Sequence, residues 1–321
     1  MVAAARRPVE LAVLVEGAQA GEARAVGRLI SLVEDQSPAL PEMAALLAPL
    51  TGRAQVIGVT GSPGVGKSTS TSALVSAYRA EGVRIGVLAV DPSSPFSGGA
   101  LLGDRVRMQD HATDHGVFIR SMATRGHLGG LSWATPQALR VLDAAGCDVI
   151  LVETVGVGQA EVEIASLADT TMLLLAPGMG DGIQAAKAGV IEIADVFVVN
   201  KADRDGADQA VRDLRNMLSL GGRHSVAGAW RPEIVRTVAT RGEGIDQVIA
   251  AVAKHAAWSA GSGERERRRQ ARAAAEIEAI AVAALRSELR NLHGNASLEG
   301  LAADVVAGKI DPYAAAERLL R

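Results

Sequence analysis

The sequence predicts an α/β protein built on a doubly wound, mostly parallel sheet. From Gln55 onward, short β-rich runs alternate with helical stretches, which is the pattern of strand–helix–strand units. Several of the runs are continuously apolar, as expected of strands that helices cover on both faces. Apolar residues make up 48% of the 321 residues and aromatic residues only 2%, so Ala, Val, Leu and Ile must form the core.

The individual elements follow from local periodicity. Residues 9–50 place apolar side chains three and four positions apart, which predicts helices. After Ser259 a Gly/Ser break precedes a charged, Ala-rich helix, and two further helical segments follow over residues 298–308 and 311–320. Seven strands are predicted between these helical parts, at residues 55–61, 84–91, 116–122, 148–156, 170–177, 195–201 and 233–240.

These shifts in pattern divide the chain into three parts. We expect an N-terminal helical extension over residues 1–54, a central domain over residues 55–259 and a C-terminal helical arm over residues 260–321. The basic run Arg265–Arg269 could bind phosphate groups, but neighbouring Glu264 and Glu266 favour a solvated helix face. The apolar face that follows needs a partner, which is either its own domain or a second subunit.

Composition excludes several classes of protein. A net charge of −3 argues against a general nucleic-acid coat, which needs a strongly basic surface. The single cysteine, Cys147, excludes an intrachain disulfide framework and a Cys-rich metal site. No apolar run is long enough to cross a bilayer, and no apolar segment follows Arg6 and Arg7 as in a secretory signal. We therefore expect a cytoplasmic protein that binds neither nucleic acid nor membrane.

A phosphate-binding loop is predicted where GSPGVGKS fits the G-x-x-x-x-G-K-[ST] pattern in full. The glycines let the backbone curl so that its N–H groups converge on phosphate oxygens, and the following helix adds its dipole. Lys67 would neutralise the β- and γ-phosphates, and the Ser68 hydroxyl would ligate Mg²⁺. The predicted nucleotide-binding residues of this loop are Gly61, Ser62, Pro63, Gly64, Val65, Gly66, Lys67, Ser68 and Thr69.

Two acidic residues at strand ends could complete the metal site. Asp91 ends its strand at the edge beside the phosphate loop, although a helix cap or a turn before Pro92 is an alternative. Glu153 occupies the place of a Walker B acid and opens the quartet ETVG, which resembles the D-x-x-G switch of GTPases. Glu153 would contact Mg²⁺ through water, and the Gly156 N–H would contact the γ-phosphate. Lys67, Glu153 and Gly156 are thus the predicted catalytic residues.

The quartet NKAD, at residues 200–203, predicts guanine recognition. The Asp203 carboxylate would accept from the N1–H and the 2-amino group of guanine, a donor pair that adenine lacks. The Lys201 stem could cover the ring face, and Asn200 could tie neighbouring loops together. Ala239, after the last strand, could offer its N–H to the base oxygen. The sequence therefore predicts Mg·GTP as substrate and GDP as product.

The catalytic machinery of this site is incomplete in the sequence. Many GTPases place a glutamine directly after the switch glycine to orient the attacking water. Here Val157 occupies that position, and Gln159 follows two residues later. We therefore expect slow hydrolysis that a partner protein accelerates.

The motifs together resemble the MeaB/ArgK (methylmalonic aciduria type A) family of P-loop GTPases. The matching stretches cover residues 58–69, 87–108, 118–132, 150–164 and 173–203, together with the helical tail. The resemblance implies a chaperone of adenosylcobalamin-dependent methylmalonyl-CoA mutase, which gates cofactor loading and protects or reactivates the enzyme. It also implies a homodimer joined partly through the C-terminal extensions. Cobalamin would belong to the client, because the chain has no D-x-H-x-x-G motif.

The same resemblance assigns further roles. It places Asp91 and Asp104 in a first switch region near Mg²⁺, and Glu153 in a second. The segment Gly178–Gly189 resembles an additional switch that responds to the mutase, although Lys187 by its chemistry alone could be a solvated lysine. The candidate coupling residues of this segment are Asp181, Gln184 and Lys187. Three residues in a matching stretch receive no role: Arg120, Arg125 and His127.

Four alternative functions remain. A nickel-insertion GTPase shares the mechanism, but it normally bears Cys/His sites that the single cysteine and six scattered histidines do not suggest. An ATP-using kinase linked to basic amino-acid transport conflicts with NKAD. A signal-recognition-type targeting GTPase would need a Met-rich segment, and the seven methionines are dispersed. Another acyl-CoA mutase is an alternative client, because the GTPase chemistry would be shared.

Overall fold

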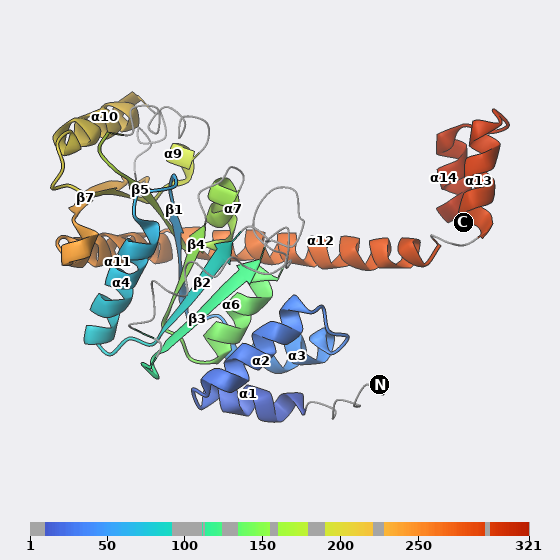
Figure 1. The fold of residues 1–321 in the computed structure, drawn as a ribbon, viewed down its shortest axis with the longest axis horizontal. Helices are drawn as coiled ribbons and strands as arrows, with labels where there is room; N and C mark the ends of the chain where they lie inside the picture. Colours follow the sequence, from blue (N-terminus) through green and yellow to red (C-terminus); the bar gives the residue numbers. More distant parts are fainter. Residues whose placement is uncertain are drawn as a thin grey trace. The chain divides into compact units, whose positions relative to one another are not determined.

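The computed structural model describes residues 10–91, 111, 113–123, 134–154, 160–178, 190–220, 228–292 and 296–320. Within this part of the chain, seven strands form one sheet in the order β3-β2-β4-β1-β5-β6-β7, and every neighbouring pair is parallel (Figure 1). The predicted fold class is confirmed, and each predicted strand is present. The strands are β1 (Gln55–Thr60), β2 (Ile85–Asp91), β3 (Val117–Ala123), β4 (Val149–Thr154), β5 (Thr170–Leu175), β6 (Val196–Asn200) and β7 (Glu233–Thr237).

The chain separates into two compact units, Met1–Arg269 and Gln270–Arg321. The first unit contains the sheet and most of the helices: α1 (Leu11–Gln19), α2 (Ala23–Glu34), α3 (Leu40–Leu47), η1 (Ala48–Leu50), α4 (Lys67–Ala80), α6 (Thr135–Ala144), α7 (Ala160–Leu167), α9 (Val190–Ile193), α10 (Ala207–Leu220), η4 (Ala239–Arg241) and α11 (Ile245–Gly261). Helix α12 (Glu264–Leu292) begins in the first unit and ends in the second, which also holds α13 (Ala296–Val306) and α14 (Pro312–Leu320).

Helices cover both faces of the sheet, which explains the continuously apolar strands. Because side chains alternate along a strand, successive residues of β5 enter different cores. Met172 and Leu174 pack in the core that α4 and α11 share, whereas Leu173 and Leu175 pack on the opposite face with α10. All six residues of β5 are buried. The doubly wound arrangement places the carboxyl ends of all strands at one edge.

The N-terminal helices pack on the sheet domain and share its core. Leu29, Ile30 and Val33 of α2 are buried in the same cluster as residues of α6 and β4. Arg120 of β3 donates through Nη2 to Glu34 of α2 and to Ser31 Oγ, 3.1 Å away. Arg120, to which the sequence analysis assigned no role, therefore ties α2 to the edge strand β3.

The solvated-face prediction for the basic run Arg265–Arg269 is wrong at two of its residues. Arg268 donates to both carboxylate oxygens of Asp195, at 2.8 and 2.9 Å. Arg269 donates to Asp169 Oδ2 at 2.8 Å and to the Gly52 carbonyl at 2.6 Å. The two carboxylates precede β6 and β5, and their side chains are only 7% and 4% exposed. The start of α12 is thus bound by ion pairs to the amino end of the sheet.

A buried histidine completes this anchor. His255 of α11 is fully buried, with Nδ1 2.8 Å from Thr170 Oγ1 and Nε2 3.3 Å from Asp195 Oδ1. The Trp230 ring meets the imidazole edge-on, with centroids 5.0 Å apart. Burial lowers the pKa of His255, and this effect outweighs the opposite pull of the Asp195 carboxylate. The ring is therefore neutral at neutral pH, and Asp195 keeps Arg268 as its cationic partner.

The second unit presents apolar side chains to solvent. On α12, the side chains of Ile277, Ile280 and Leu285 are 68%, 52% and 59% exposed. They belong to the Ala-rich helix whose apolar face, by the sequence prediction, packs on its own domain or on a second subunit. None of the described helices is both long enough and apolar enough to pass through a bilayer.

We expect Arg268→Ala to lower the free energy of unfolding by about 2–4 kcal/mol, because it leaves the buried Asp195 carboxylate without its guanidinium. Arg267→Ala is the matched control, since Arg267 is 73% exposed and pairs with Glu264 on the same helix. Urea unfolding followed by tryptophan fluorescence measures both variants. Equal midpoints for the two variants would contradict the anchor.

Candidate functional site

The predicted phosphate loop connects the central strand β1 to α4. All three of its glycines have positive φ values, +142° at Gly61, +81° at Gly64 and +97° at Gly66. A Cβ at Gly61 would collide with the Leu174 carbonyl oxygen, and one at Gly66 would collide with the Asn200 amide. Only glycine fits either position, because both the backbone conformation and the space exclude a side chain. The loop therefore curls tightly against β5 and against the end of β6.

Positive charge gathers at this loop. Lys67, the first residue of α4, is only 7% exposed, and its Nζ donates to the carbonyls of Gly61 and Ser62 at 2.6 and 3.1 Å. The ammonium group thus bonds to the loop from the first residue of a 14-residue helix. The backbone N–H groups and the dipole at the start of a helix both favour an anion.

A pair of oxygen ligands lies beside the loop. Ser68 Oγ donates to Glu153 Oε1 at 2.7 Å, and the two residues are 7% and 4% exposed. The register of β1 with β4 pairs Val59 with Glu153, which brings the carboxylate to the loop at the carboxyl edge of the sheet. A hydroxyl and a carboxylate oxygen form the hard donor set that Mg²⁺ prefers. The chemistry of these two residues therefore fits the predicted metal.

Several residues singled out from the sequence lie wholly or partly outside the described part of the chain. The backbone of Asp91 ends β2 one position past Val90, which pairs with Thr154 of β4. Its backbone thus lies at the predicted edge, but its side chain is outside the described part. Other predicted or unassigned residues lie outside the described ranges, and their roles stay predictions: Asp104, Gly156, Asp181, Gln184, Lys187, Arg125 and His127.

The predicted base-recognition segment is bonded to the phosphate loop. Asn200, which ends β6 and is 3% exposed, donates through Nδ2 to the Val65 carbonyl at 2.9 Å. Its Oδ1 accepts from Thr237 Oγ1 at 3.2 Å and from the Ala239 N–H at 3.1 Å. One side chain therefore joins three loops, as expected from the sequence. Because Ala239 donates to Asn200 here, its contact with a base oxygen stays a prediction.

Lys201 adds a second bond between the same two segments. It has a positive φ of +57°, and its Nζ donates to the Gly64 carbonyl at 2.6 Å. Its aliphatic stem consequently runs from the end of β6 towards the phosphate loop. Asp203, two residues later, is 37% exposed and accepts from Arg241 Nη2 at 2.8 Å. The predicted base acceptor thus remains accessible beside a fixed lysine stem.

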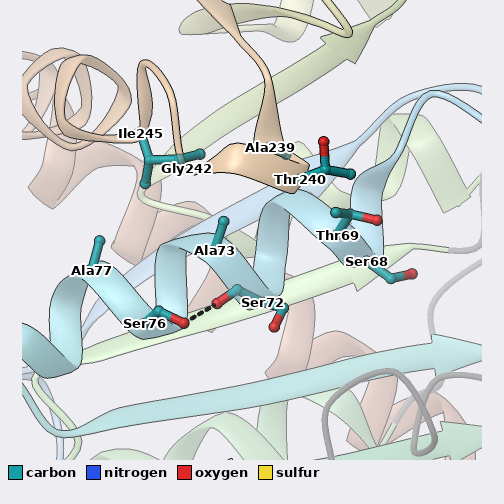
Figure 2. Close-up of a pocket in the computed structure, with 10 residues that line it drawn as sticks. All are labelled: Ser68, Thr69, Ser72, Ala73, Ser76, Ala77, Ala239, Thr240, Gly242 and Ile245. Atoms are coloured by element: carbon teal, nitrogen blue, oxygen red, sulfur yellow. Dashed lines mark hydrogen bonds between the residues drawn. The ribbon is translucent and has the colours of Figure 1, made fainter. Parts of the chain in front are cut away.

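A cavity of about 740 Å³ opens beside the phosphate loop, between α4 and the turn that leads into α11 (Figure 2). The sequence interpretation missed most of its lining, since small residues on a helix usually indicate packing. The signal was present as small side chains at positions 72, 73, 76 and 77, which share one face of α4. The lining residues are Ser68, Thr69, Ser72, Ala73, Ser76, Ala77, Ala239, Thr240, Gly242 and Ile245.

The sequence model of one protein family, described as methylmalonyl Co-A mutase-associated GTPase MeaB, matches residues 26–293. This chain belongs to the MeaB family. The match includes the whole sheet and both nucleotide motifs, so the residues placed above lie within the family's shared region. The predicted resemblance is confirmed.

Relatives of this chain include two proteins that carry GTPase names. A GTPase-named protein of Pyrococcus abyssi is 47% identical over 96% of this chain and 95% of its own length. GTPase ArgK of Escherichia coli is 38% identical over 72% of each chain. A mouse protein named methylmalonic aciduria type A homolog, mitochondrial, is 43% identical over 62% of this chain and 48% of its own. A crystal structure described as LAO/AO transport system kinase covers 98% of both chains with a TM-score of 0.69 and 26% identity.

We expect Asn200→Ala to lower the free energy of unfolding of the nucleotide-free protein by about 2–4 kcal/mol, because three buried groups on two neighbouring segments lose their partner. Asn216→Ala, at an exposed position of α10, is the matched control and should stay within about 0.5 kcal/mol of the parent protein. Urea unfolding without nucleotide measures both. If the two variants unfold alike, Asn200 does not join the loops.

Proposed function

We propose that this MeaB-family protein hydrolyses GTP to GDP and phosphate in a Mg²⁺-dependent reaction. The observation that carries the proposal is the bonding of the NKAD segment to the phosphate loop, through Asn200 to Val65 and Lys201 to Gly64. These bonds hold the segment that carries Asp203, the proposed base acceptor, close to the proposed phosphate site. A single nucleotide can therefore engage both motifs at once.

Guanine selectivity rests on Asp203 in this proposal. Its carboxylate has no hydrogen to donate, so it suits a base edge that presents two N–H donors. Adenine would cover the carboxylate without supplying the two N–H donors, and an acceptor that loses water without gaining a hydrogen bond costs free energy. Ala239 would add a contact to the base oxygen after nucleotide binding. The GTPase names of the relatives support this choice of base.

Ser68 and Glu153 would hold Mg²⁺, with Asp91 and Asp104 as further candidate ligands. The ion would supply neutralisation of negative charge on the phosphate oxygens. Lys67 would contribute to the same end from inside the loop, where its ammonium already bonds to Gly61 and Ser62. The Gly156 N–H would donate to the γ-phosphate. These groups position and neutralise the phosphates, and a partner would complete the machinery for water attack.

The biological role proposed is that of a chaperone for adenosylcobalamin-dependent methylmalonyl-CoA mutase. The family description supports the mutase as client. The bound nucleotide would alter residues 178–189, where Asp181, Gln184 and Lys187 would link the nucleotide state to the mutase surface. Through this contact the protein would gate cofactor loading and protect or reactivate the mutase. Another acyl-CoA mutase is a second candidate client, because the nucleotide chemistry would not change.

We further propose a homodimer formed through the C-terminal helices. The large apolar side chains exposed on the described part of α12, at positions 277, 280, 282 and 285, support it because such a surface favours burial against another helix. The domain division at residues 54 and 259 belongs to the same proposal, with residues 260–321 as the dimerisation arm.

One competing function follows from the structural relative whose description calls it a transport system kinase. An ATP-using kinase would need to accept adenine at the Asp203 position.

Lys67→Ala should abolish detectable binding of GTP, and Asp203→Asn should reduce the preference for GDP over ADP by at least tenfold. Lys254→Ala, an exposed lysine of α11, is the control. Calorimetric titration with each nucleotide decides the base, and full selectivity in Asp203→Asn would refute the NKAD assignment.

The partner is tested by measuring GTP hydrolysis with and without a methylmalonyl-CoA mutase from the same source. We expect a slow basal rate that the mutase raises at least tenfold, because it would supply groups for water attack that the chain lacks. An equal concentration of an unrelated cobalamin enzyme is the control. A slow rate that the mutase leaves unchanged would remove this client while retaining the GTPase.

A further inference from the structure

A guanidinium lies next to the proposed base acceptor and takes part in neither nucleotide motif. Arg241 Nη2 donates to Asp203 Oδ2 at 2.8 Å, across 38 residues of sequence. Its other terminal nitrogen, Nη1, lies 3.4 Å from Glu243 Oε1. Arg241 therefore binds Asp203 through a single hydrogen bond, from Nη2 to Oδ2, and the pair is not bidentate. The remaining acceptor positions of the carboxylate stay open to a ligand.

The backbone that carries Arg241 is fixed to the same loops as Asn200. Arg241 is the last residue of η4, the short helix that begins at Ala239. Its N–H donates to the Val238 carbonyl at 2.8 Å, and Val238 bonds in turn to the Glu243 carbonyl at 3.0 Å. On the other side, the Ala202 N–H donates to the Thr237 carbonyl at 3.0 Å. The guanidinium is consequently supported by a tight turn beside the NKAD segment.

We propose that Arg241 is a positioning residue for guanine recognition, which orients the Asp203 carboxylate towards the base. The inference rests on the proposed GTPase function and adds a specificity determinant to the same site. Asp203 is 37% exposed, so its side chain would otherwise sample several rotamers before the base arrives. A donor fixed on one oxygen restricts these rotamers. Each carboxylate oxygen accepts two hydrogen bonds, so Oδ2 can keep Arg241 while the base approaches.

Inosine nucleotides separate this role from a general effect of charge or folding. Inosine keeps the N1–H but lacks the 2-amino group, so the ratio of GDP to IDP affinity reports how well the carboxylate meets both donors. A loss of positive charge alone would weaken GDP and IDP equally, because their phosphates are identical. A rotated Asp203 carboxylate would weaken GDP more than IDP.

The test is calorimetric titration of the full chain with GDP, IDP and ADP. We expect the GDP-to-IDP affinity ratio to fall about threefold or more in Arg241→Ala, as expected when one hydrogen bond to a charged group is weakened. Arg241→Lys should restore part of the ratio, since lysine offers a shorter, single-point donor. Arg236→Ala is the control: Arg236 lies on β7 and pairs with Asp208, so the same charge is removed without touching Asp203.

Three results would overturn the inference. If the parent protein binds ADP as tightly as GDP, the guanine assignment fails and this inference fails with it. If the parent prefers GDP but Arg241→Ala leaves the GDP-to-IDP ratio unchanged, only the positioning role is refuted. If Arg241→Ala binds GDP more tightly, the arginine competes with the base for Asp203 and does not position it.

Discussion

The site depends on one constraint, the parallel direction of every described strand pair in the sheet. Since the carboxyl ends of parallel strands meet at one edge, groups from distant parts of the sequence converge there without a dedicated scaffold. The phosphate loop follows β1, Glu153 is the second-to-last residue of β4, and Asn200 is the last residue of β6. Hydrogen bonds then fix their relative positions, from Ser68 to Glu153 and from Asn200 to the Val65 carbonyl.

The opposite edge of the sheet carries a second set of charges. Asp169 and Asp195 stand at the amino ends of β5 and β6, where each also accepts a backbone N–H, from Val56 and Thr171 respectively. Arg268 and Arg269 of α12 neutralise them. Buried carboxylates are tolerated because they are paired and hydrogen-bonded. The pairs join the first turns of α12 to the sheet, and the rest of that helix belongs to the second unit.

Strand β6 links the two edges. Asp195 precedes it and holds Arg268, whereas Asn200 ends it and holds the phosphate loop. Five buried residues, Val196–Asn200, form the strand between the anchor of α12 and the proposed base site. In the proposed function, the NKAD segment extends from a buried strand that is fixed at its far end. This strand resists movement of the segment when a nucleotide binds, even though the Asp203 and Arg241 side chains are partly exposed.

The sequence by itself determined the features that depend on neighbouring residues. Short β-rich, mostly apolar runs predicted all seven strands, and the phosphate loop and NKAD were evident because glycine, lysine and carboxylate chemistry requires a fixed short spacing. The tertiary structure decided the features that join distant residues. Arg268 pairs with Asp195 across 73 residues, and Arg269 pairs with Asp169 across 100. Local charge pattern favoured solvent for both arginines, because no local signal shows which buried carboxylates the folded sheet brings near. The contact of Arg241 with Asp203 depends on the fold for the same reason.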